Sequence, residues 1–166
     1  MGENHMANEH LSTYLNDHLA GSVAAIELLE HLEASEFDGQ LTRFFSDLRG
    51  DIAADRAELE NLMKSLNIDE SRTRKASAWL TGKFTELKLR VDDPAGGALR
   101  LFESLEVLSL GIEGKRSLWK ALIAVSEQSP SLKVMNYDRL IKRAEEQRER
   151  VERHRLITAQ QALDVI

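Results

Sequence analysis

Apolar residues recur at steps of three and four along most of the chain, the spacing that places side chains on one face of an α-helix. Four long stretches show this spacing, and we expect a helix in each: residues 8–34, 40–67, 98–126 and 137–163. The second stretch is the most regular, and one member of its apolar stripe is an aspartate, Asp55. Helices of similar length pack well side by side, so the pattern predicts a four-helix bundle.

Turn-forming residues separate the predicted helices. Residues 37–39 (FDG) join the first two, which should form an antiparallel hairpin because the connection is so short. A longer connection, residues 68–97, follows, and a weaker apolar stripe around Trp79 predicts a short extra helix within it. Residues 129–131 (SPS) separate the last two helices. With only 9 glycines and 2 prolines, the chain has too few turn formers for an all-β fold, so we expect an all-α fold.

The length and composition favour one domain. A chain of 166 residues is too short for two ordinary domains, and we expect a single domain over residues 1–166, with residues 1–8 as a flexible tail and residues 68–97 as a crossover. No long apolar run is present, and the first ten residues lack the features of a secretory signal, so we expect a cytoplasmic protein without a membrane span. The absence of cysteine excludes disulfides, iron–sulfur clusters and cysteine nucleophiles.

Charge is distributed unevenly. The net charge of −6 has the wrong sign for a protein that binds nucleic acid, and we expect no such partner. Residues 1–66 hold 13 acidic and 4 basic side chains, which leaves 15 acidic and 18 basic ones for residues 67–166. The asymmetry indicates either a basic surface for an acidic partner or an acidic hairpin that docks on a basic one, and we favour the second.

Two long hairpins joined by a helical crossover resemble the ferritin-like superfamily over residues 8–163. Five short segments are also similar to an uncharacterised bacterial family of ferritin-like proteins: 14–21 (YLNDHLAG), 55–56 (DR), 78–80 (AWL), 110–115 (LGIEGK) and 144–147 (AEEQ). The resemblance implies a four-helix up-down bundle with a long crossover that contains an extra short helix. It implies no activity.

Metal-binding members of the superfamily hold two iron or manganese ions with a Glu from each of two helices and a Glu-x-x-His pair from each of the other two. That spacing places both side chains on one helix face. No Glu-x-x-His occurs here, because the residues three positions before the five histidines are Gly2, Ala7, Leu15, Leu28 and Val151. Gln147, a poor metal ligand, stands at the inward position of the last helix. We therefore expect no di-metal cofactor and no catalytic residue.

Polar residues nevertheless lie on the inward stripes: Asp55, Gln147, His154, and His18 with Ser22. Burial of an unpaired aspartate costs several kcal/mol, so Asp55 must have a partner. We expect it to be buried, ionised and charge-paired near Gln147, within reach of His18 or Ser22.

Two kinds of partner are open to Asp55. In one, it joins carboxylates of other helices in a site for a hard cation such as Mn, Mg or Ca; the candidates are Glu27, Glu106 and Glu113. In the other, which we favour, it pairs with a positive side chain; the candidates are Lys115, Arg56 and His18.

The sequence therefore favours a non-catalytic bundle that acts by self-association or by binding another protein. The alternative is an Fe- or Mn-binding carboxylate protein with a degenerate di-metal site, either an oxidoreductase or a metal store. No Gly-x-Ser-x-Gly or Walker spacing points to another chemistry.

Overall fold

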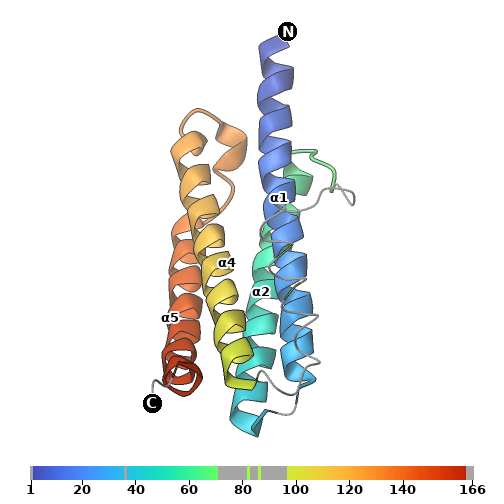
Figure 1. Cartoon of the computed structure of the whole chain (residues 1–166). Coiled ribbons are helices and arrows are strands. Elements are labelled where there is room, and N and C mark those ends of the chain that lie inside the picture. The colour runs from blue at the N-terminus through green and yellow to red at the C-terminus, as the bar shows by residue number, and fades with distance from the viewer. Residues whose placement is uncertain (1, 36, 71–81, 83–85, 87–96, 164–166) are drawn as a thin grey trace.

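The chain folds into an all-α four-helix bundle in the computed structural model (Figure 1). The structure describes residues 2–35, 37–70, 82, 86 and 97–163, and within them no strand occurs. The elements are α1 (Gly2–Glu33), α2 (Gly39–Ser65), α4 (Gly97–Ser126), the 3-10 turn η2 (Pro130–Leu132) and α5 (Tyr137–Ala162). All four predicted helices are thus confirmed, with ends that differ by one or two residues apart from the start of α1.

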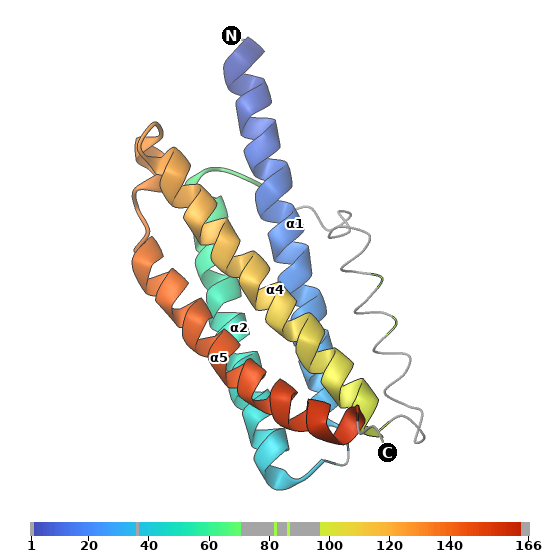
Figure 2. The same ribbon diagram turned by 60° about the vertical axis from the view of Figure 1, so that its left-hand side comes forward.

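The helices form two antiparallel hairpins, α1 with α2 and α4 with α5 (Figures 1 and 2). α2 ends and α4 begins at opposite ends of the bundle, so these two helices run in the same direction, as a crossover between hairpins requires. The extra helix predicted around Trp79 lies outside the described residues. None of the described helices combines the length and the apolar character needed to cross a membrane.

The start of α1 differs from the prediction. The helix begins at Gly2, so residues 2–8 are helical where we expected a flexible tail. No proline follows Gly2 before the apolar stripe begins at Leu11, so nothing in the sequence ends the helix there. The buried face of α1 is also rotated slightly: Tyr14 is 37% exposed, whereas Asn16 and Leu28 are buried.

Side chains fix both ends of α2. Asp38 is the N-cap, and its Oδ1 accepts hydrogen bonds from the backbone N–H groups of the first turn, at 2.8 Å from Gln40 and 3.0 Å from Leu41. At the other end, Asn67 takes a left-handed conformation with φ of 53°, the backbone reversal that commonly terminates a helix. The buried amide of Asn16 donates to the carbonyl of Asp69 at 3.2 Å and thereby ties α1 to the end of α2.

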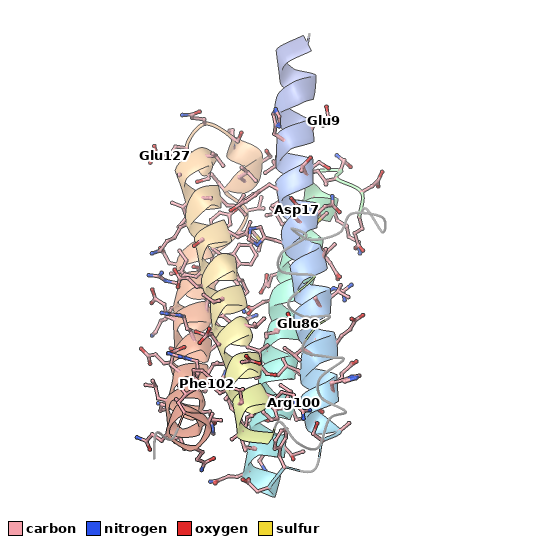
Figure 3. The ribbon with its side chains drawn as sticks, viewed as in Figure 1. Glu9, Asp17, Glu86, Arg100, Phe102 and Glu127 are labelled. Atoms are coloured by element: carbon pink, nitrogen blue, oxygen red, sulfur yellow. The ribbon has the colours of Figure 1, made fainter. Side chains whose placement is uncertain are left out.

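The apolar core consists of two clusters stacked along the bundle. The first lies toward the α1–α2 turn and includes Leu29, Phe45, Ile52, Leu105 and Ile112. The second lies toward the α4–α5 turn and includes Leu19, Leu59, Leu62, Trp119 and Leu140. In Figure 3, Arg100 and Phe102 mark the first end of the bundle and Glu127 marks the other. The level between the two clusters is polar.

Candidate functional site

Asp55 of α2 occupies the level between the two apolar clusters. It follows Ile52 by three residues, lies on the same buried face, and is only 2% exposed. Its Oδ1 accepts a hydrogen bond from Arg143 Nε at 2.6 Å, and its Oδ2 accepts one from Gln147 Nε2 at 2.8 Å and another from Lys115 Nζ. We call these four side chains the Asp55 layer.

Gln147 links the members of the layer to one another. Its amide nitrogen donates to Asp55, while its amide oxygen accepts a hydrogen bond from Lys115 Nζ. The amide is therefore satisfied at both ends and held in one orientation, although it is only 1% exposed. The layer joins three helices: α2 supplies the carboxylate, α4 the ammonium, and α5 the guanidinium and the amide.

The layer carries two cations and one carboxylate. Burial lowers the pKa of Lys115, and the nearby Asp55 carboxylate opposes this effect. The side chains of Lys115 and Arg143 are 15% and 27% exposed, so neither cation is fully solvated. With both cations protonated and Asp55 ionised, the layer has a net charge of +1.

Ion pairs also dock the two hairpins on each other. Asp51, Asp55 and Glu58 of α2 pair with Arg150, Arg143 and Arg139 of α5, in the order that two antiparallel helices impose. Acidic side chains come from the first hairpin and basic ones from the second. The acidic first hairpin and the basic second hairpin therefore pair with each other at this interface, as the favoured interpretation of the uneven charge predicts.

The prediction for Asp55 is confirmed in its main points. Asp55 is buried, close to Gln147, and paired with Lys115, one of the three predicted partners. Arg56 pairs instead with Glu60 of its own helix at 2.7 Å. Arg143 was missed: the only indication was its position one turn before Gln147 on α5.

The carboxylates proposed for a metal site do not join Asp55. Glu106 and Glu113 both lie on α4 beside arginines. Glu113 lines a surface groove between α4 and α5, at 2.8 Å from Arg116, and Glu106 lies 3.5 Å from Arg155 of α5. Glu27 is exposed on α1. Within the described residues, no group of three or more His, Asp or Glu side chains could hold a metal ion.

The remaining polar candidates make their described contacts with residues other than Asp55, although His18 and Ser22 line the same cavity as Asp55. The Ser22 hydroxyl donates to the Leu19 carbonyl at 2.6 Å, so it serves its own helix. The His154 ring of α5 packs on Phe44 with a centroid distance of 4.0 Å, and burial lowers the pKa of His154. The His18 ring packs edge-on against the Tyr14 ring, with a centroid distance of 4.8 Å. Burial lowers the pKa of His18, and the negative charge of Asp17 partly offsets this effect.

A cavity of about 260 Å³ lies beside the layer, between α1, α2 and α4. Asp17 marks the part of α1 that borders it in Figure 3. The described lining is mostly apolar, with Asp55, Lys115 and His18 among its polar members. Gly21 also lines it, and a Cβ added there would meet no atom within 4 Å. The cavity thus has room on its α1 wall.

No family model, curated protein or solved structure matches the chain. The chemistry of the site therefore rests on its own residues.

Replacement of Asp55 with Asn should strongly destabilise the fold. The amide keeps the shape of the side chain but leaves Lys115 and Arg143 without a counter-charge, which costs about 3 kcal/mol when a buried pair is broken. The matched control is Asp51→Asn, one turn earlier on the same helix, whose half-exposed pair with Arg150 should contribute less than about 1 kcal/mol. Urea unfolding measures both free energies, and equal losses would contradict a special role for the layer.

Stability should fall as the pH drops below about 6.5, the ordinary pKa of histidine. Because burial lowers the pKa values of His18 and His154, the unfolded chain binds more protons than the folded one between the lowered values and 6.5, so stability rises with pH in that window. Urea unfolding at pH 7.5, 6.5 and 5.5 measures this. His18→Gln should flatten the profile, because it removes one of the two groups whose pKa burial lowers. A variant profile as steep as that of the wild type would contradict the prediction.

Proposed function

We propose that the chain is a cytoplasmic, non-catalytic ferritin-like bundle that acts through its surface, by association with a second copy of itself. The proposal that the bundle is non-catalytic rests on the hydrogen bonds of Asp55, whose carboxylate is already bound by side chains of the protein. Both of its oxygens accept hydrogen bonds from cationic side chains, Lys115 and Arg143.

This arrangement disfavours a metal centre at the same level of the bundle. Iron and manganese need carboxylate oxygens that can coordinate, and Asp55 already gives both of its oxygens to the protein. Lys115 and Arg143 would also repel a divalent cation. The layer supplies what a metal would otherwise supply, which is positive charge for a buried carboxylate.

An apolar surface supports self-association. Leu156, Ile157 and Leu163 near the end of α5 are 57%, 58% and 53% exposed, and Leu99 at the start of α4 is 45% exposed. These two helix ends lie at the same end of the molecule (Figure 2). Single exposed apolar residues are ordinary, but a group of them is typical of an interaction site. Two copies of one apolar surface complement each other around a two-fold axis.

Elemental analysis tests the non-catalytic part. Protein purified without chelator and incubated with Fe²⁺ or Mn²⁺ should retain far less than one ion per chain after gel filtration. About two tightly bound ions per chain, the content of a di-metal centre, would contradict the proposal and favour the iron or manganese carboxylate protein, an oxidoreductase or a metal store.

Sedimentation velocity tests self-association. The wild-type chain should form a dimer or larger oligomer as its concentration rises, and the double variant Leu156→Glu/Ile157→Glu should shift it to monomer because charge opposes apolar contact. Val134→Glu is the control, since Val134 is equally apolar and 65% exposed but follows η2 at the other end of the molecule. A wild-type chain that stays monomeric at high concentration would contradict self-association.

A further inference from the structure

The cavity between α1, α2 and α4 is large enough for an organic molecule. Its volume of about 260 Å³ exceeds the roughly 150 Å³ of an engineered apolar cavity that binds benzene. Ile52, Leu108 and Ile112 supply apolar wall, and Gly21 leaves open space on the α1 side. An apolar guest would therefore find a matching surface over most of the cavity.

One buried hydrogen-bond donor of the cavity lining lacks an acceptor, and a second lining residue has a donor to spare. Trp119 lines the cavity and is 1% exposed, and its Nε1 has no hydrogen-bond partner. Lys115 has three N–H donors, of which the described residues take two, through Asp55 and Gln147. A buried donor without an acceptor destabilises the folded chain. A guest that brings acceptor oxygens would relieve this destabilisation.

The charges of the wall favour an anion at Lys115. Asp55 is shared by Lys115 and Arg143, so one positive charge of the layer has no counter-charge within it. Arg56 also lines the cavity but is already paired with Glu60. Asp17 is the one carboxylate of the described lining outside the layer, and it lies on α1 next to His18, whereas Lys115 is on α4. A carboxylate guest beside Lys115 would give this cation a second hydrogen-bonded negative partner besides Asp55.

We propose that this cavity binds a small apolar carboxylic acid, with the carboxylate against Lys115 Nζ and the indole N–H of Trp119, and the hydrocarbon part against Ile52, Leu108 and Ile112. This site goes beyond the proposed surface association and does not depend on it. An aliphatic and an aromatic acid share this chemistry, so both serve as probes.

Isothermal titration calorimetry of the full chain with octanoate, benzoate and 1-octanol tests the proposal. At least one acid should bind saturably at one molecule per chain, and 1-octanol should bind at least tenfold more weakly than octanoate because it lacks the charge. The indole N–H resonance of Trp119 should shift on addition of the acid. Absence of binding by both acids, or equal binding of octanol and octanoate, would overturn the proposal.

Two glycine variants locate the site. Gly21→Leu places a side chain in the cavity and should abolish acid binding, whereas Gly50→Leu, at an exposed helical glycine of α2 with equally open space and no part in the cavity wall, should bind as the wild type does. Gly114→Leu fills the same cavity from α4 and replaces Gly21→Leu if that variant fails to fold. Unchanged affinity in a folded cavity-filling variant would show that the acid binds elsewhere and overturn the proposal.

Discussion

The middle of this bundle depends on the neutralisation of one buried carboxylate. Asp55 lies on a helix face that is otherwise apolar, so it enters the core with its neighbours and must find its hydrogen-bond donors there. Those donors come from two other helices: Lys115 from α4, and Arg143 and Gln147 from α5. A slip of any one helix by a turn, about 5.4 Å, would break at least one of these bonds. The layer thus fixes the axial register of three helices, which two apolar clusters alone would specify less sharply.

The cavity follows from the same constraint. Among the described residues, the donors to Asp55 come from α4 and α5, and α1 contributes none. Where α1 passes the layer it presents Gly21 and Ser22, and the Ser22 hydroxyl bonds to its own helix. The larger side chains of the layer fill this level from α4 and α5. The small side chains of α1 opposite them leave unfilled space. The polar layer and the cavity are therefore two sides of one packing arrangement.

The sequence predicts the helices and the burial of Asp55 because both depend on local periodicity. A residue three positions after Ile52 and four before Leu59 must share their face, whatever the other helices do. Asp38 was likewise predictable, since an N-cap acts within its own turn. The boundary that failed, the start of α1, had no stop signal to mark it.

Partners across helices were harder to predict, for a physical reason. Arg143 stands in a stretch of mixed charge that is typical of a solvated helix face, and its burial depends on the length of its side chain rather than on its helical position. The same holds for Arg150, which reaches Asp51 on α2 although Glu146 precedes it by four residues on its own helix. Periodicity gives the direction of a Cβ atom but not the end point of a long side chain. That end point depends on the distance between helices, which only the assembled bundle defines.

A metal ion and an ion-pair layer answer the same physical need in a helical bundle, since both bring positive charge to carboxylates that packing has buried. They differ in what they leave available. A metal keeps coordination positions that a substrate can occupy, whereas Lys115 and Arg143 are covalent parts of the chain and their bonds to Asp55 cannot be exchanged without loss of stability. The layer is therefore suited to holding the bundle together. The proposed acid would use groups beside it: one N–H of Lys115, the indole of Trp119 and the space beside Gly21. The proposed binding site thus lies next to the structural centre of the molecule rather than at it.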